Sequence, residues 1–228
     1  MFKYEMHCHT AEVSKCASNS AENQVKFYFD MGYNGLCITD HFLNGNTTVT
    51  ADACWNSRVS MFLEGYNRAK VMGDKLGIDV FLAWEYSYFG TDFLTYGLDE
   101  KWLYKNPDCL DWTVSEYCDR VHDAGGVIVQ AHPFREAGYI EMIRLMPRHV
   151  DAVETLNANR TDFENDMADK YADSYCLTKI VGSDNHTGNQ ARLAAIEFNR
   201  RINTLEELLK AIRSGEGSNR LYNLTPDE

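Results

Sequence analysis

Two histidines near the amino terminus are the first residues whose type and spacing suggest chemistry. His7 and His9 follow an alternation of apolar and polar residues over positions 2–6, which predicts a β-strand. Side chains two residues apart on an extended backbone point to the same side, so both imidazoles are placed to bind one metal ion. Taken alone, the pair fits two solvated histidines at a strand end equally well.

Residues of the same chemical kind follow other predicted strands. Short β-branched runs lead into Thr39-Asp40-His41, Ala131-His132-Pro133 and residues 182–187, and a further run over residues 80–84 ends at Glu85. Strand ends that are merely polar would not select histidine and acidic residues so consistently. The candidate metal ligands at these strand ends are His7, His9, His41, Glu85, His132, Asp184 and His186.

This ligand set predicts more than one metal ion. Imidazole and carboxylate suit borderline divalent ions such as zinc, manganese or iron, and the ligands are too many for one tetrahedral site. We therefore expect two or three divalent ions, with the two oxygens of Glu85 bridging two of them. Closely spaced ions clamp one phosphate and activate a water for in-line attack, which makes Glu85, Asp184 and His186 the expected catalytic centre.

The elements that must position these residues alternate along the chain. Periodicity and capping signals predict helices at residues 20–31, 57–75, 113–124, 161–175 and 204–215. Strands are expected at residues 2–6, 35–39, 80–84, 93–96, 127–129, 151–154, 179–181 and 192–198. Strands separated by helices indicate a parallel sheet with right-handed crossovers. We therefore expect an α/β fold, a distorted TIM-like (β/α)7 barrel whose strand carboxyl ends gather the ligands.

The composition limits the classes of function. No Pro- or Ser-rich linker divides the 228 residues, so residues 1–228 are expected to form one domain. An excess of 34 acidic over 22 basic residues disfavours binding to long nucleic acid. The seven cysteines are scattered without CxxC spacing, which favours the reducing cytoplasm. The first residues do not resemble a signal peptide, and no apolar run reaches ~18 residues. We therefore expect a soluble protein and not a secreted or membrane protein. The oligomeric state stays open.

Together, these motifs resemble those of the polymerase and histidinol phosphatase (PHP) family. The resemblance follows the family's motif order over nearly the whole chain, in His7-Cys8-His9-Thr10, Ile38-Thr39-Asp40-His41, Glu85, Ala131-His132-Pro133 and Gly182-Ser183-Asp184-Asn185-His186. It implies a distorted barrel that hydrolyses phosphate esters with up to three metal ions. By the family's pattern, the first metal would be held by His7, His9, Glu85 and Asp184, the second by Glu85 and His132, and the third by His41 and His186.

The chain departs from the family's pattern at two places. The second metal usually takes a histidine just before an apolar strand, and Asp92 stands at that place here. The family also has a histidine or aspartate a few residues beyond the first motif, where this chain has Ser14-Lys15. We expect Asp92 to coordinate the second ion, although an aspartate also commonly caps a turn such as the one at Gly90. Glu12 or, with less support, Cys16 is expected to complete the third site.

Arginines close to the strand-end motifs are candidates for substrate binding. Arg135, Arg160 and Arg192 are near enough for a guanidinium to grip a phosphate with two hydrogen bonds, unless they are ordinary solvated arginines. The aromatic residues around Glu85, namely Trp84, Tyr86, Tyr88 and Phe89, suit either the floor of a substrate pocket or the core.

The sequence thus predicts a free-standing metal-dependent phosphoesterase that acts on a small phosphorylated molecule, with phosphomonoesters favoured. Clustered metals also activate water against carbonyl carbon, so hydrolysis of a C–N or carboxylic ester bond is a second hypothesis. A third hypothesis, of a different class, is a metal-stabilised regulatory module without turnover. Its only support is that Asp92 and Glu12 would replace the usual ligands of the family.

Overall fold

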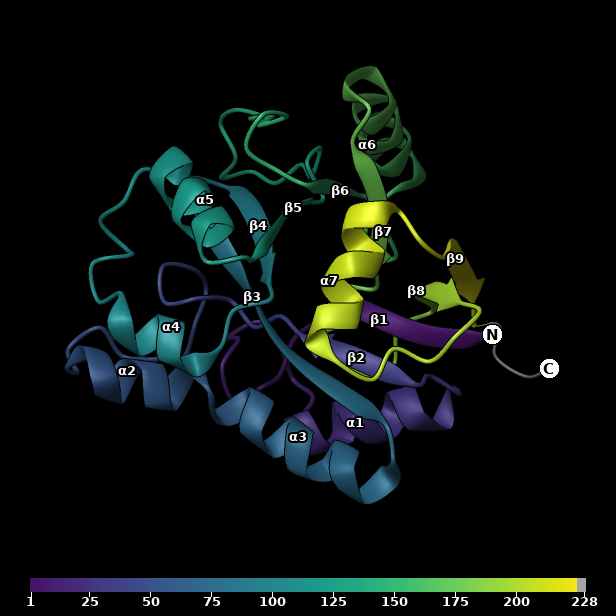
Figure 1. Ribbon diagram of the computed structural model, residues 1–228, viewed down its shortest axis with the longest axis horizontal. Coiled ribbons are helices and arrows are strands. Elements are labelled where there is room, and N and C mark those ends of the chain that lie inside the picture. Colours follow the sequence, from purple (N-terminus) through teal and green to yellow (C-terminus); the bar gives the residue numbers. More distant parts are fainter. Residues whose placement is uncertain (225–228) are drawn as a thin grey trace.

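The computed structural model describes residues 1–224, which contain nine strands and seven helices (Figure 1). The strands are β1 (Phe2–Cys8), β2 (Gly35–Ile38), β3 (Asp79–Tyr88), β4 (Thr91–Tyr96), β5 (Val127–Ala131), β6 (Ala152–Asn157), β7 (Thr178–Gly182), β8 (Arg192–Phe198) and β9 (Ser218–Asn223). The helices are α1 (Ala21–Asp30), α2 (Trp55–Phe62), α3 (Glu64–Leu76), α4 (Glu100–Lys105), α5 (Val114–Asp123), α6 (Asp162–Tyr175) and α7 (Leu205–Ser214). Over these same residues, no helix combines the length and apolarity needed to cross a membrane.

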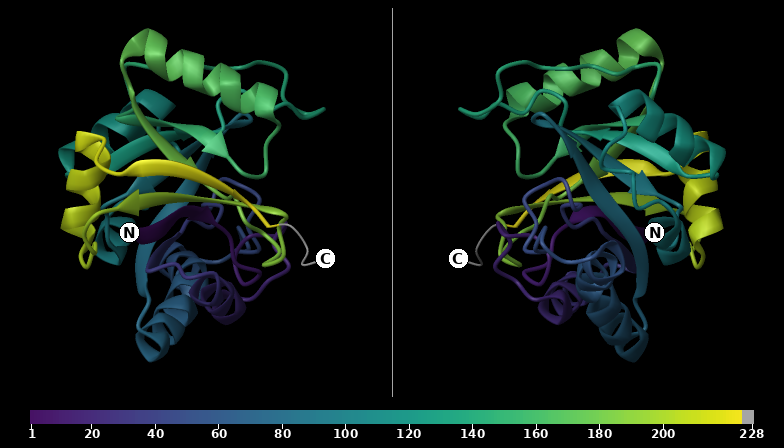
Figure 2. Two further views of the ribbon diagram at one scale, coloured as in Figure 1. Left: turned by 90° about the vertical axis from the view of Figure 1, so that its right-hand side faces the viewer. Right: turned by 90° about the vertical axis from the view of Figure 1, so that its left-hand side faces the viewer.

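The strands form one sheet that curls into a nearly closed barrel. Neighbouring strands follow the order β7-β6-β5-β4-β3-β2-β1-β8-β9. The curl closes where Cys8 of β1 pairs in parallel with Asn185, just beyond β7, and where the His9 amide donates to the Asn185 carbonyl at 2.9 Å. Figure 2 shows the strands wrapping around a common centre, with α1 and α3 on one side and α6 on the opposite side. The expected α/β barrel fold is confirmed.

The strand directions correct the expectation of a parallel sheet. The pairs β1–β2, β2–β3, β5–β6 and β6–β7 are parallel, whereas β3–β4, β4–β5, β1–β8 and β8–β9 are antiparallel. The reason is clearest between β3 and β4, which are joined by Phe89 and Gly90 alone. So short a loop joins only antiparallel strands, because a parallel neighbour needs a crossover connection of about a dozen residues or more. The barrel is therefore distorted rather than a regular repeat of β/α units.

Most predicted elements are present with shifted bounds. The helix expected at residues 57–75 is two helices, α2 and α3, which meet at Leu63. The strand expected to end at Glu85 continues past it, because β4 folds back and pairs with it. Helix α4 and strand β9, each six residues long, are absent from the sequence-based prediction. Helices α5 and α6 begin with capping boxes at Thr113 and Thr161.

Two buried layers flank the barrel wall around the expected site. Ala83 of β3 belongs to a layer of mainly aliphatic residues that also includes buried residues of α7. Trp84 and Tyr86 belong to a second, aromatic layer with Tyr117 of α5, and both are buried. Because side chains alternate along a strand, Glu85 shares the face of Ala83. Trp84 and Tyr86 are therefore core residues and not the floor of a pocket.

Candidate metal centre

His7 and His9 face each other at the carboxyl end of β1, where both are buried and their Nε2 atoms lie 3.1 Å apart. The other nitrogen of each ring is engaged elsewhere. His7 Nδ1 lies 2.9 Å from Glu154 Oε1, and His9 Nδ1 lies 3.0 Å from Ser14 Oγ. A histidine whose Nδ1–H donates to an oxygen keeps the lone pair of Nε2 free, which is a common arrangement in metal ligands. The structure therefore places two Nε2 atoms with free lone pairs side by side, as ligands of a metal ion require.

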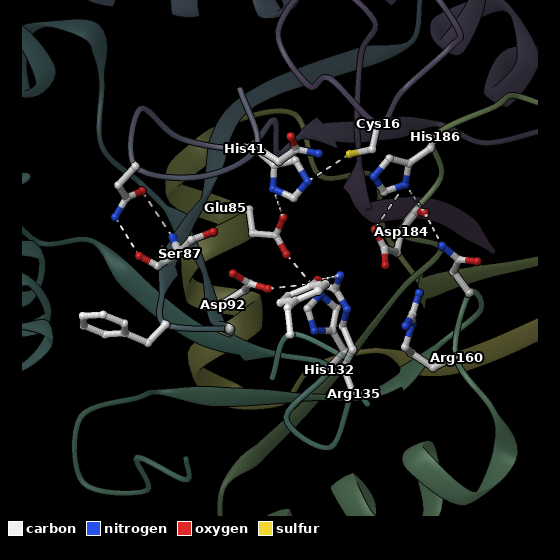
Figure 3. A pocket seen from close by; sticks show the side chains of 16 residues that line it. Cys16, His41, Glu85, Ser87, Asp92, His132, Arg135, Arg160, Asp184 and His186 are labelled. Carbon is white, nitrogen blue, oxygen red and sulfur yellow. Dashed lines mark hydrogen bonds and ion pairs between the residues drawn. The ribbon is translucent and has the colours of Figure 1, made fainter. Parts of the chain in front are cut away.

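Glu85 lies between histidines that come from different strands; Figure 3 shows it between His41 and His132. Its Oε1 is 3.1 Å from His132 Nε2 and 3.5 Å from His7 Nε2. Its Oε2 is 2.7 Å from His41 Nδ1 and 3.6 Å from His9 Nε2. The two oxygens thus face different sides of the cluster, as a carboxylate that bridges two ions must.

The segment after β7 brings in Asp184 and His186. Asp184 Oδ1 lies 3.5 Å from His7 Nε2 and 3.4 Å from His9 Nε2. His186 Nδ1 donates to the Asp184 carbonyl at 2.8 Å, so Nε2 is its free nitrogen. Asp184 has a φ angle of +52° and His132 one of +24°, which are uncommon for residues other than glycine. Such backbone conformations gather at functional sites, where the surrounding structure holds them.

All of the expected strand-end ligands belong to one connected cluster. Three sets of three side chains each offer ligand atoms within 4.8 Å of one another. The sets are His7, Glu85 and His132; His7, His9 and Asp184; and His9, His41 and His186. Because the sets share His7 and His9, they form a single group of candidate ligands for divalent metal ions.

Two buried atoms test whether a cation fits this cluster. Within the part of the chain that the structure describes, Glu85 Oε2 and His41 Nδ1 have no hydrogen-bond partner. They lie 2.7 Å apart, but they are not oriented toward each other for a hydrogen bond. A buried polar atom without a partner is costly, and cations bound in this cluster would satisfy these two atoms. Imidazole and carboxylate are also the ligands that zinc, manganese and iron accept, so the residues fit such ions.

The electrostatics of the cluster set the protonation of its ligands. Burial by itself raises the pKa of Glu85, but the facing histidines, led by His41, hold this pKa well below its ordinary range. Burial also acts to raise the pKa of Asp184, but the facing histidines, led by His7, hold this pKa well below its ordinary range. Burial lowers the pKa of His9 well below its ordinary value, so His9 is neutral. Burial also acts to lower the pKa of His41, but Glu85 more than offsets this and the pKa rises to about 11. A cation bound at His41 therefore has to displace a proton.

A buried carboxylate that sequence reasoning missed supports these ligands from behind. Glu154 of β6 accepts hydrogen bonds from His7 Nδ1 at 2.9 Å, from the His132 amide at 3.0 Å and from the Asn157 side chain at 2.9 Å. It therefore orients the ring of His7 and holds the backbone at His132. The available signal was a glutamate inside the run Val153-Glu154-Thr155, where a charged residue on a predicted buried strand is unexpected.

A second buried carboxylate, Asp40, connects the segments around His9. It accepts from the Thr10 amide at 2.6 Å and from the Ser14 hydroxyl at 2.7 Å. Burial raises the pKa of Asp40 to about 6. Because the Ser14 hydroxyl donates to Asp40, its oxygen is left to accept from His9 Nδ1. Ser14, which stands where the family places a ligand, thus orients His9 instead.

Comparisons with known proteins show what this chain is similar to. Residues 162–216 match the family model described as PHP-associated. A two-domain protein from Bacteroides vulgatus that contains a predicted PHP-like metal-dependent phosphoesterase shares the fold, with a TM-score of 0.72 and 14% identity over 97% of this chain and 64% of that one. Residues 162–216 are thus similar to the PHP-associated family, and the chain shares the fold of a PHP-like protein. No curated protein sequence matches it.

Two further solved structures share the fold of this chain. One, from Bifidobacterium adolescentis, is described as a metal-dependent phosphoesterase and has a TM-score of 0.57 and 14% identity over 94% of this chain and 96% of that one. The other is an amidohydrolase from Chromobacterium violaceum with bound sulfate and no metal, and has a TM-score of 0.54 and 13% identity over 97% of this chain and 98% of that one. The chain thus spans nearly the whole of these two proteins but 64% of the two-domain one.

Asp92 and Glu12, two expected ligands at positions that depart from the PHP pattern, have different surroundings. Asp92 is buried in the wall of the site, where its Oδ2 lies 3.3 Å from Arg135 Nη1. Among residues 1–224, none of the three ligand sets includes Asp92. Glu12 is not brought to the cluster, because its carboxylate accepts from the Ala21 amide at the start of α1 and lies 3.4 Å from Arg68. The structure therefore corrects the expectation that Glu12 completes the third site.

Cys16, the other candidate for the third site, does reach the cluster. Its Sγ lies 3.2 Å from His41 Nε2 (Figure 3). Partial burial acts to raise the pKa of this thiol, but His186 and His41 more than offset it and lower the pKa to about 6. A thiolate is the form of cysteine that binds metals. Cys16 is therefore placed and charged to act beside His41 and His186.

The cluster lies at the bottom of a pocket of about 650 Å³. Arg135 and Arg160 line this pocket, as expected for substrate-binding residues. Arg192 does not, because its guanidinium donates to the Asp162 carboxylate at 2.8 Å and to the Arg160 carbonyl at 2.5 Å. The structure thus brings two of the three expected arginines to the site, and Arg192 instead holds the segment that carries Arg160.

Proposed function

We propose that the chain is a metal-dependent phosphoesterase that hydrolyses a small phosphorylated molecule, with phosphomonoesters favoured. The observation that carries this proposal is one pocket that combines Glu85, placed between several histidines, with Arg135 and Arg160. A phosphate monoester carries close to two negative charges. Divalent cations and guanidinium groups are both suited to bind it.

The ligands divide naturally among two or three divalent ions. The first ion would be held by His7, His9, Glu85 and Asp184, the second by Glu85, His132 and Asp92, and the third by His41, His186 and Cys16. When bound, such ions polarise phosphoryl oxygens and lower the pKa of water. Zinc, manganese and iron all suit this mixture of ligands.

The chain's own side chains orient the substrate. Arg135 and Arg160 both line the pocket, and Asp92 positions Arg135 there, so both guanidinium groups are placed to contact phosphate oxygens. Hydrolysis transfers the hydroxyl of a water to phosphorus and breaks the bond to the ester oxygen. The other proton of the water passes to that oxygen, which leaves as an alcohol. The arginines stabilise the charge that spreads over the phosphate oxygens as this happens.

A hydrolase of C–N or carboxylic ester bonds is the second candidate, because one structure of the same fold is an amidohydrolase. The two arginines favour phosphate, since a neutral amide does not require a pair of guanidinium groups. A metal-binding module without turnover is the third candidate.

We also propose a cytoplasmic enzyme whose partner is a small-molecule substrate and not long nucleic acid. All seven cysteines, each within the described residues, are free, which suits a reducing compartment. The excess of acidic residues supports the exclusion of nucleic acid.

A hydrolysis panel tests the proposal. Protein reconstituted with zinc, manganese or iron(II) would be assayed on phosphate monoesters, phosphate diesters, carboxylic esters and amides, and its metal content measured by elemental analysis. We expect at least two ions per chain and turnover of monoesters. Glu85→Ala should lower kcat/KM by more than about 100-fold, and by more than any single histidine change, because a bridging carboxylate serves two ions.

Glu206→Ala removes an exposed glutamate from α7 and serves as the matched control. Near-normal activity of Glu85→Ala would contradict the bridge. Hydrolysis of amides or carboxylic esters alone would favour the second candidate, and inactivity of the fully metallated protein on the whole panel would favour the third.

A further inference from the structure

The turn between β3 and β4 holds an aromatic residue in an unfavourable backbone conformation. Phe89 and Gly90 have φ angles of +49° and +79°, while Tyr88 and Thr91 on either side pair across the hairpin. Two-residue turns with positive φ at both positions favour Asn-Gly or Asp-Gly. A bulky residue with positive φ is a genuine outlier. Phe89 thus occupies a position that asparagine would fill with less strain.

Burial does not explain the choice of Phe89. Its side chain is 76% exposed, whereas Trp84, Tyr86 and Phe93 on the same two strands are buried. Its one aromatic neighbour among the described residues is Tyr88, with ring centroids 4.9 Å apart. A residue that neither suits its turn nor packs into the core indicates a role at the surface.

Tyr139 reaches the same pocket from the segment between β5 and β6. It is 65% exposed, and both Phe89 and Tyr139 line the pocket that contains the ligand cluster. The Arg135 guanidinium lies 5.5 Å from the centre of the Tyr139 ring and also donates to its hydroxyl. Arg144 lies 5.8 Å from the centre of the Phe89 ring and donates to the Phe89 carbonyl at 2.8 Å. An arginine therefore helps to hold each ring at the pocket.

The pocket is larger than a phosphate group requires. Its volume of about 650 Å³ lies within the range of sites for drug-sized ligands, about 300–1,000 Å³. A phosphate would lie near the ligand cluster, Arg135 and Arg160. The rest of the substrate would then extend toward Phe89 and Tyr139. Aromatic faces prefer a planar ring to a saturated ring of similar size, because only the planar ring can stack.

We propose that Phe89 and Tyr139 form a stacking subsite for a planar aromatic or heteroaromatic group of the substrate. The substrate class is then phosphate esters whose alcohol carries such a ring. The phosphate part of this inference rests on the proposed function, whereas the subsite is a statement about binding and is measured separately below.

Benzyl phosphate and cyclohexylmethyl phosphate are matched probes for the subsite. Both are primary esters, and they differ in whether the ring is planar. With the metal-reconstituted protein, we expect kcat/KM to be about tenfold higher for benzyl phosphate. Phe89→Leu and Tyr139→Leu should reduce this ratio to within about twofold, because either change removes one stacking face. Phe29→Leu, which replaces an exposed phenylalanine on α1, should keep the original ratio.

Binding of non-hydrolysable analogues separates the subsite from the chemistry. Benzylphosphonate and cyclohexylmethylphosphonate would be titrated calorimetrically into the metallated protein, and the same preference is expected. A binding preference without hydrolysis of any ester would support the subsite and contradict the phosphoesterase. Hydrolysis without any preference, or binding of neither phosphonate, would overturn the subsite.

Phe89→Asn gives a readout that does not depend on activity. Asparagine tolerates positive φ, so this variant should melt at a higher temperature than the original protein while it loses the preference for the planar ring. A lower melting temperature together with an unchanged preference would show that Phe89 has a purely structural role.

Discussion

The Nδ1 atom of His7 lies 2.9 Å from Oε1 of Glu154, although the two residues are 147 positions apart in the chain. Both side chains are fully buried. The contact turns Nε2 of His7 toward the ligand cluster, while the second oxygen of Glu154 accepts from the His132 amide. One carboxylate thus orients two expected ligands that belong to different strands.

Replacing Glu154 should therefore weaken metal binding without removing any ligand. For Glu154→Ala we expect the metal affinity to fall about 10–100-fold, the usual cost of losing an outer partner of a ligating histidine. Glu154→Gln keeps an acceptor oxygen and should have a smaller effect. Competition with a chelator measures both, with Glu206→Ala as the surface control. Unchanged affinity in Glu154→Ala would show that His7 needs no such support.

Cys16 should be shielded from alkylation when metal is bound. Its Sγ lies beside His41, and a metal-bound thiolate is a weaker nucleophile than a free one. Iodoacetamide labelling followed by mass spectrometry should show modification of Cys16 slowed about tenfold or more by metal. The exposed Cys54 and Cys176 are internal controls and should react at the same rate in both states. Equal labelling of Cys16 with and without metal would contradict its role as a ligand.

Asp92 stays a predicted ligand of the second ion, and two variants separate this role from its pairing with Arg135. If Asp92 binds the ion, manganese or iron(II) should support activity at least as well as zinc, and Asp92→His should shift the preference toward zinc. If Asp92 only positions Arg135, Asp92→Asn should raise KM for phosphate esters and leave metal content unchanged. Anomalous scattering decides directly: a second ion with no Asp92 oxygen within about 2.0–2.6 Å would exclude coordination.

Glu5 should make the stability of the fold depend on pH. Its Oε1 accepts from the His7 and Ser183 amides, both at 2.8 Å. Burial nevertheless raises its pKa from 4.5 to about 7. Because the folded pKa exceeds the unfolded one, the protonated form stabilises the fold. This contribution is complete below about pH 4.5 and is lost as the pH rises through about 7.

The size of the shift corresponds to about 3 kcal/mol at most. Glu5→Gln stays uncharged, so its free energy of unfolding should decrease less between about pH 5 and pH 8 than that of the original protein. Denaturant titrations at the two pH values measure the difference. An identical pH dependence in both proteins would mean that Glu5 is ionised in the fold throughout.

The ligand positions at strand ends could be predicted because the signals are local. A period of two places His7 and His9 on one side of a strand, and a β-branched run before Ala131-His132 predicts where that strand ends. The antiparallel β3–β4 hairpin could not be predicted in the same way. Its turn contains Phe89, which is not a typical turn residue, so the usual sequence signal of a hairpin is missing.

The local sequence pattern also did not predict which residue completes the third metal site, because Glu12 and Cys16 both lie a few residues beyond the first motif. Residues 10–20 do not continue as a strand, so spacing does not say which side chain returns to the cluster. The structure uses Glu12 at the start of α1 and directs Cys16 to His41. Such a choice depends on how the segment packs against its neighbours.

The sequence by itself determined the class of fold, the kinds of ligand and the strand ends that carry them, because periodicity and ligand chemistry are properties of neighbouring residues. Only the tertiary structure decided that Glu85 lies between His41 and His132, that Glu154 orients His7, and that Phe89 borders the same pocket. These relationships join residues that are far apart in the chain. They arise from the curling of the sheet and from strand pairing, which no local pattern of residues encodes.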